Sequence, residues 1–111
     1  MRSRDERAPP ALPDLTVIYW RDIPAQVKAT DGGASARQEL SERFLKAIDA
    51  AAMKAGLVGM DEYLDEWQHE SRPCGDDLAR EVAEEAARIE TAFTDHVLRG
   101  LIRSGGQGGR P

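Results

Sequence analysis

Four consecutive residues, Tyr19, Trp20, Arg21 and Asp22, bring two aromatic rings, a guanidinium and a carboxylate together in the sequence. Such rings stack on planar ligands, and Trp, Tyr and Arg dominate the energetics of protein interfaces. The stretch is therefore the first candidate for a site that binds a ligand or a partner. The structural alternative is that both aromatics belong to the core and that Arg21 forms a local ion pair with Asp22.

Residues that could ligate a metal are few, because His69, Cys74 and His96 are the only imidazoles and the only thiol. Glu66 and His69 have the Glu-x-x-His spacing that places two ligands on one helical face. Di-iron bundles use two such motifs with two further glutamates, and a structural zinc site uses four Cys or His ligands. No metal site and no cofactor are predicted, and the two histidines are expected at the surface.

Nucleophilic catalysis has no better support in the sequence. Cys74 lies close to Asp76 and Asp77, whose negative charges raise rather than lower the pKa of a thiol. The sequence contains neither of the common glycine-rich phosphate-binding motifs. No catalytic residue is predicted, and a non-enzymatic protein is the working hypothesis.

The strongest strand signal surrounds the aromatic residues. Residues 17–20, Val-Ile-Tyr-Trp, are all β-branched or aromatic, which favours a strand over residues 15–21 with apolar side chains on both faces. Pro24 interrupts this run because it has no N–H to donate. A second alternating stretch at residues 25–30 completes a two-stranded antiparallel hairpin. Since such a ribbon is marginal alone, helices or another chain must cover it.

Three helices are predicted to follow a glycine turn at residues 31–33. The first spans about 36–55, after a Ser-x-x-Gln capping box at 35–38. The second spans about 60–70, and the third about 77–103. The third helix would have about 27 residues and a length of about 40 Å. Because this exceeds the size of a compact domain, part of it is expected to project or to pack on another chain.

The 111 residues are expected to form one domain. Residues 1–14, with three arginines and three prolines, are predicted to be a disordered arm, and the glycine-rich residues 104–111 a flexible tail. Residues 15–103 are predicted to form an α+β domain in which an N-terminal two-stranded hairpin packs on three helices, the last one long.

The net charge of −5 is concentrated in residues 59–96, where twelve acidic residues face three arginines. Such an acidic surface repels a phosphate backbone and an anionic membrane, so neither nucleic acid nor membrane is an expected partner. No apolar run approaches the roughly 20 residues of a membrane helix. Residues 1–13 lack the apolar segment of a secretory signal, and a single cysteine fits a reducing compartment. A cytoplasmic location is expected.

Four stretches carry a family resemblance: Val-Ile-Tyr-Trp-Arg-Asp-Ile-Pro-Ala-Gln-Val at 17–27, Leu-Ser-Glu-Arg-Phe at 40–44, Ala-Ile-Asp-Ala-Ala-Ala-Met at 47–53 and Tyr-Leu-Asp-Glu-Trp at 63–67. Over about residues 15–70, the chain resembles the small bacterial virulence factor domain family. Members of that family stand beside corrinoid and folate one-carbon enzymes, so the resemblance implies an accessory subunit. The family's name records a phenotype and lends no catalytic role to the matching motif positions, Tyr19, Trp20, Arg21, Pro24, Gln26, Arg43, Phe44 and Asp49.

Two functional hypotheses follow. The first is a non-enzymatic accessory or interaction protein that presents its hairpin edge and long C-terminal helix to a larger enzyme or to a second copy of itself. The alternative is a module that binds a small ligand or a cofactor in a pocket between hairpin and helices. The predicted binding residues are Tyr19, Trp20, Arg21, Asp22, Gln26 and Arg43.

Overall fold

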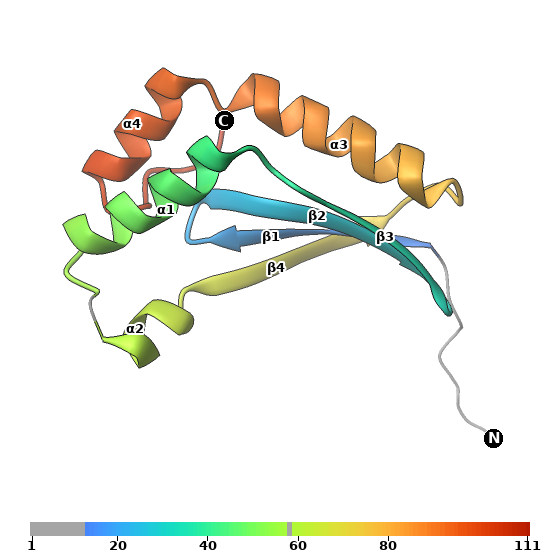
Figure 1. The fold of residues 1–111 in the computed structure, drawn as a ribbon, viewed down its shortest axis with the longest axis horizontal. Helices are drawn as coiled ribbons and strands as arrows, with labels where there is room; N and C mark the ends of the chain where they lie inside the picture. The colour runs from blue at the N-terminus through green and yellow to red at the C-terminus, as the bar shows by residue number, and fades with distance from the viewer. Residues whose placement is uncertain (1–12, 58) are drawn as a thin grey trace.

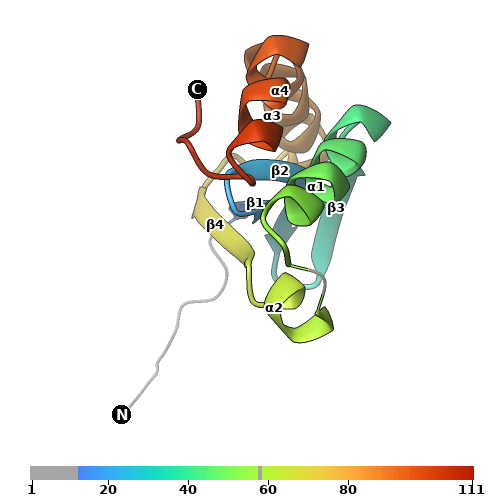
Figure 2. The ribbon, with the colours of Figure 1, turned by 90° about the vertical axis from the view of Figure 1, so that its left-hand side faces the viewer.

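A four-stranded antiparallel sheet forms the base of the molecule, and its strands lie in the order β3-β2-β1-β4. The computed structural model describes residues 13–57 and 59–111. In chain order the elements are β1 (Asp14–Trp20), β2 (Ile23–Asp31), β3 (Ala34–Glu39), α1 (Glu42–Lys54), α2 (Met60–Leu64), β4 (Trp67–Pro73), α3 (Leu78–Ala92) and α4 (Asp95–Arg103). Helices α1, α3 and α4 cover one face of the sheet, whereas the short α2 lies at one end (Figures 1 and 2).

The core lies between this sheet face and the three covering helices. Alternate residues of β1 and β2 enter it, and Val17 lies opposite Val27 in the antiparallel register. From α1, Phe44 and Ile48 are fully buried against them. Three of the four alanines of α1, Ala47, Ala51 and Ala52, are also buried, which allows a close approach of neighbouring elements. The apolar periodicity predicted for this helix is therefore confirmed within Glu42–Lys54.

The α+β class is confirmed, but the two-stranded hairpin packed on three helices is wrong. Residues 34–39 form strand β3 and pair with β2, although residues 36–39 were expected to open the first helix. The glycine turn is present, with Gly32 at a φ of 61°, and it reverses the chain directly onto β2. This pairing satisfies the backbone groups of β3 that face β2, so the capping-box pattern at 35–38 is overridden by the sheet. Helix α1 begins only after Ser41.

The predicted second helix is wrong for most of its length. Only Met60–Leu64 is helical, and Trp67–Pro73 is strand β4, which pairs antiparallel with β1. The strand places Trp67 opposite Trp20 and His69 opposite Ile18. β1 is therefore a central strand of the sheet, with β2 on one side and β4 on the other.

The predicted long third helix is two helices. Helix α3 ends at Ala92, and the side chain of Thr94 caps α4 by accepting a hydrogen bond from the Val97 amide at 3.2 Å. The break turns α4 back onto α1, so its buried residues Leu98 and Leu101 reach the core. A single straight helix would have carried them past it.

The structure describes the C-terminal segment of the chain but little of the N-terminal segment. The predicted disordered arm, residues 1–14, lies outside the described residues except for Pro13 and Asp14, and Asp14 begins β1. The glycine-rich segment 104–111 turns back to the β1–β2 turn, where the Asp22 amide donates a hydrogen bond to the Gly106 carbonyl at 2.9 Å. No helix in the described part of the chain is long and apolar enough to cross a membrane.

Candidate functional site

The predicted binding residues do not form one site, and Trp20 is a core residue. Its side chain is fully buried. The indole Nε1–H donates a hydrogen bond to the Tyr63 carbonyl at 2.9 Å, and the ring stacks on the Tyr63 ring at 5.6 Å between centroids. This contact fastens the end of β1 to α2.

Arg21 and Asp22 form the turn between β1 and β2 and hold the C-terminal segment. Arg21 adopts a φ of 53°, an unusual conformation for a residue other than glycine. Its Nε–H donates to Glu66 at 2.9 Å and its Nη1–H to the Gly105 carbonyl at 3.0 Å. The Asp22 carboxylate accepts a hydrogen bond from the Gly109 amide at 2.9 Å. The two residues therefore bind neighbouring segments and not each other.

Gln26 and Arg43 lie apart from that turn and from each other. Gln26 lies on β2 beside Trp67 and the exposed Leu45 of α1, where the three line a small pocket. Arg43 donates hydrogen bonds to the Phe93 carbonyl at 2.6 Å and the Glu90 carbonyl at 2.7 Å. It thereby connects α1 to the end of α3.

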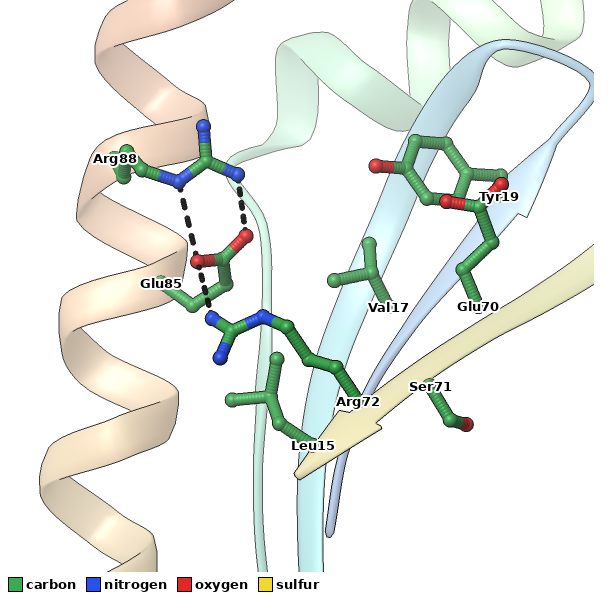
Figure 3. Close-up of a pocket in the computed structure, with 8 residues that line it drawn as sticks. All are labelled: Leu15, Val17, Tyr19, Glu70, Ser71, Arg72, Glu85 and Arg88. Carbon is green, nitrogen blue, oxygen red and sulfur yellow. Dashed lines mark hydrogen bonds and ion pairs between the residues drawn. The ribbon is translucent and has the colours of Figure 1, made fainter. Parts of the chain in front are cut away.

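Tyr19 borders a cavity with charged walls, which we call the charged cavity. It lies between strands β1 and β4 and helix α3 and has a volume of about 320 Å³ (Figure 3). Two strands supply its floor and one wall, and α3 supplies the other wall. Its lining residues are Leu15, Val17, Tyr19, Glu70, Ser71, Arg72, Glu85 and Arg88.

A buried carboxylate, that of Glu85, organises the charges of this cavity. Arg72 Nη2 donates to Glu85 Oε1 at 3.1 Å, and Arg88 donates through Nε at 3.1 Å and Nη2 at 2.5 Å. Burial by itself would raise the pKa of Glu85, but the hydrogen bonds and charges of Arg88 and Arg72 outweigh it and hold that pKa below its usual value. Glu85 is therefore ionised at neutral pH.

Arg110 lies against two residues that line the charged cavity, Tyr19 and Glu70. The Arg110 guanidinium lies 3.5 Å from the centre of the Tyr19 ring, and it pairs with the carboxylates of Glu70 and Asp22. Burial raises the pKa of the Tyr19 hydroxyl, although the charge of Arg110 opposes that shift. The phenol therefore keeps its proton and remains a hydrogen-bond donor at neutral pH.

Arg72, Glu85 and Arg88 were absent from the predicted site. Glu85 carried a usable signal, because it falls within the apolar stripe of α3 that contains Leu78, Val82 and Ala86. An acid on the buried stripe of a helix needs a cationic partner, and Arg88 follows it at i+3. Arg72 carried no such signal, since its position depends on β4.

A second concave surface, which we call the methionine groove, lies between the end of α1 and α2. It has a volume of about 670 Å³ and is lined by Asp49, Ala52, Met53, Leu57, Gly59, Met60 and Tyr63. Met53 is 75% exposed and Met60 is 70% exposed, and the neighbouring Leu64 is 51% exposed. Flexible, polarisable methionine side chains at a surface are typical of binding sites for other proteins.

The methionine groove has an acidic border. Asp49 lies in its wall, and the exposed Asp61 and Glu62 occupy the first turn of α2. Residues 49–65 contain four acids and a single basic residue, Lys54, which gives this stretch a net charge of −3. The groove therefore combines an apolar floor with a negative border.

Other reactive side chains are not gathered into a site by the described residues. No group of three or more His, Cys, Asp or Glu side chains among them could hold a metal ion. Burial and the charge of Glu81 raise the pKa of the Cys74 thiol, so the nucleophilic thiolate is disfavoured.

Comparison with known proteins gives one match. The model of the family described as Virulence factor matches residues 18–102, which is more than half of the chain and extends from within β1 to the last turn of α4. No curated protein and no solved structure matches the chain.

Proposed function

We propose that this protein, which belongs to the Virulence factor family, is a non-enzymatic accessory protein that binds a larger enzyme through the methionine groove. The observation that carries the proposal is the exposure of Met53 and Met60 on opposite sides of one groove. Because both side chains are at least 70% exposed, they bury little apolar surface within their own chain and contribute little to its folding stability. Burial against a partner would remove their apolar surface from water, which is favourable.

The surfaces named from the sequence are less suitable for such a contact. The edges of the β1–β2 hairpin are occupied, because β3 pairs with β2 and β4 pairs with β1. The long C-terminal helix is replaced by α3 and α4, which both bury their apolar residues in the same core. The methionine groove is instead exposed and apolar, and it therefore becomes the proposed contact surface.

The chemistry of the groove also indicates which part of an enzyme would occupy it. An apolar floor with an acidic border suits an amphipathic helix that has apolar residues on one face and Lys or Arg along its margins. The family resemblance extends the proposal to corrinoid and folate one-carbon enzymes as the class of partner. A reducing compartment suits the free Cys74 thiol, so the proposal places the complex in the cytoplasm.

A non-catalytic role is supported by the state of the polar side chains. Glu85 is held ionised by two arginines, and its pKa lies below the usual value, far from the near-neutral pKa of an efficient general acid or base. The raised pKa of Cys74 likewise disfavours its reactive form.

The test is capture of partners from the native cell by three forms of the tagged protein. The first form is the wild type, the second carries Met53→Ser with Met60→Ser, and the third carries Leu45→Ser. Leu45 is a matched control because it is a 47% exposed apolar residue of the same helix that does not line the methionine groove. We expect the wild type and the control to retain a stoichiometric enzyme, and the double variant to bind it at least about tenfold more weakly.

Two results would contradict the proposal. One is that the double variant captures the enzyme with the same efficiency as the wild type does, because the contact would then lie outside the methionine groove. The other is a wild-type protein that is recovered alone and forms a dimer that the double variant cannot form. The groove would then be an interface between two copies of this chain.

A further inference from the structure

Arg72 and Arg88 share a single carboxylate, that of Glu85, so this cluster carries a local charge of +1. A second cluster, in which Arg110 pairs with both Glu70 and Asp22, carries a charge of −1. The local positive charge lies beside the apolar floor of the cavity. We infer that the charged cavity binds a small organic carboxylate, independently of the partner proposed for the methionine groove.

Hydrogen-bond donors remain available for such an anion. Arg88 uses its Nε and Nη2 atoms on Glu85, and among the described residues nothing accepts a hydrogen bond from its Nη1 or from the Tyr19 hydroxyl. Figure 3 shows the Tyr19 hydroxyl directed toward the side of α3 that carries Arg88. A guanidinium and a protonated phenol on two sides of one cavity are suitable donors for a carboxylate.

Glu85 holds Arg88 and Arg72 in place for this task. The Glu85 side chain is only 8% exposed and fixed on α3, whereas the two arginines are more than half exposed. A free surface arginine would lose side-chain entropy on binding an anion. Here each guanidinium is already bound to the buried carboxylate in the folded protein, so ligand binding would cost less additional side-chain entropy. The arginines are therefore preorganised.

The floor of the cavity indicates an organic ligand rather than an inorganic one. Leu15, Val17 and the Tyr19 ring present apolar surface, and a volume of about 320 Å³ is at the lower end of small-molecule sites. Inorganic phosphate would leave this surface uncovered. A carboxylate on a short aliphatic or aromatic stem would place its charge beside Arg88 and its stem over Leu15 and Val17.

The inference is tested by titrating the full-length protein with benzoate, benzamide and inorganic phosphate, and by following its amide resonances by NMR. Benzoate and benzamide have the same stem and differ in charge. We expect benzoate to give saturable shifts at Leu15, Val17 and Tyr19, with an affinity at least about tenfold higher than that of benzamide. Phosphate is expected to bind more weakly than benzoate.

Three variants locate the binding. Tyr19→Phe removes one donor with little effect on packing, and Arg88→Gln removes the guanidinium, so each is expected to weaken benzoate binding by about tenfold. Arg80→Gln is the matched control, because Arg80 lies on the same helix and pairs with Glu84 outside the cavity. Its affinity for benzoate should equal that of the wild type.

Each contrary result is decisive. Equal affinities for benzoate and benzamide would show that the arginines do not recognise charge, and tighter binding of phosphate would make this an inorganic anion site. An absence of saturable shifts with benzoate, or an Arg80→Gln variant as impaired as Arg88→Gln, would also overturn the inference. Tyr19→Phe keeps the test valid if Arg88→Gln fails to fold.

Discussion

The ion-pair cluster of Arg72, Glu85 and Arg88 leads to a prediction about stability, because its members differ sharply in burial. The Glu85 side chain is 8% exposed, whereas those of Arg72 and Arg88 are 54% and 62% exposed. We consider a double variant, Arg72→Met with Arg88→Met, which keeps most of the apolar stems but removes both positive charges. The comparison is with Glu85→Gln, which removes the acid instead.

The magnitudes follow from which charge is left without a partner. In the double variant a carboxylate that is more than nine-tenths buried loses both cations, and breaking a buried pair in this way costs about 3–5 kcal/mol. Since the arginines are largely solvent-exposed, water reaches part of the site after they are replaced, and we expect the lower end, about 3 kcal/mol. In Glu85→Gln the guanidiniums are rehydrated, so the expected loss is only about 1 kcal/mol.

The pH dependence of the double variant has a definite sign. In the wild type the pKa of folded Glu85 is lowered, so its stabilisation is present above the ordinary carboxyl pKa of about 4.3 and is lost as the pH falls through the lower folded value. In the double variant burial acts unopposed and raises that pKa. The penalty is then present at neutral pH and is relieved as the pH falls through the raised value, because the carboxyl takes up a proton.

The measurement is the free energy of unfolding in urea for the wild type and both variants, at about pH 7.5 and about pH 5. The difference between wild type and double variant should shrink on acidification. Arg80→Met serves as a control, since its exposed pair with Glu84 on the same helix should matter much less. The reasoning fails if the difference is the same at both pH values, or if Glu85→Gln is more destabilising than the double variant.

Two further predictions concern the C-terminal part of the chain. Gly106 has a φ of 91°, and a Cβ at this position would lie 2.8 Å from Trp20 Cζ3, whereas Gly109 has a φ of 88° and no such neighbour within the described structure. Gly106→Ala should therefore lower the free energy of unfolding by about 1–3 kcal/mol more than Gly109→Ala does. Equal losses of stability in the two variants would contradict the contact between Gly106 and Trp20. Arg43→Met removes the hydrogen-bond donor to the Phe93 carbonyl and should lower the free energy of unfolding by about 1–2 kcal/mol. Amide hydrogen exchange in the last turn of α3 should become faster. Unchanged exchange there would contradict the role of Arg43 in connecting α1 to the end of α3.

The features that the sequence predicted well are those with a local physical cause. The β1 strand follows from its β-branched and aromatic residues, and the turn at Gly32 follows from the need for a positive φ. The apolar stripe of α1 follows from its spacing of three and four residues. Each of these depends on neighbours in the sequence, so no knowledge of the rest of the fold was required.

The two edge strands were missed because their sequences contain no strand pattern. In β3 five of the six residues are exposed, and in β4 six of the seven are exposed. Such strands have no apolar alternation, and they form because β2 and β1 offer unpaired backbone groups beside them. Short, polar edge strands also protect a sheet from pairing with other chains, so their composition reflects their position rather than their conformation.

The division between α3 and α4 shows a different limit. The apolar steps from Leu78 to Leu101 continue through the break without interruption, so periodicity alone indicates one helix. Thr94 is an ordinary capping residue, but a threonine within a helix pattern is not by itself a stop signal. The break is selected by packing, since it allows Leu98 and Leu101 to reach the core.

The binding site predicted around Tyr19 included Trp20, which is a core residue. Trp20 attracted the prediction because interface and core residues share the same chemistry, and a buried indole with a bonded N–H is the ordinary structural use of tryptophan. It follows that Trp20→Ala would disrupt the core and is unsuitable as a test of binding, whereas Tyr19→Phe leaves the packing in place.

The charged cavity shows why a site of this type depends on the fold rather than on a motif. The sequence contained a signal for the part of the cavity that α3 supplies, because Glu85 interrupts an apolar stripe and Arg88 follows one helical turn later. The other half required β4, whose register with β1 places Arg72 opposite Leu15 and thereby beside α3. A shift of that register by one residue would turn the Arg72 side chain to the opposite sheet face, leaving Glu85 with a single partner. The sharing of one buried carboxylate by two arginines is thus a consequence of strand pairing.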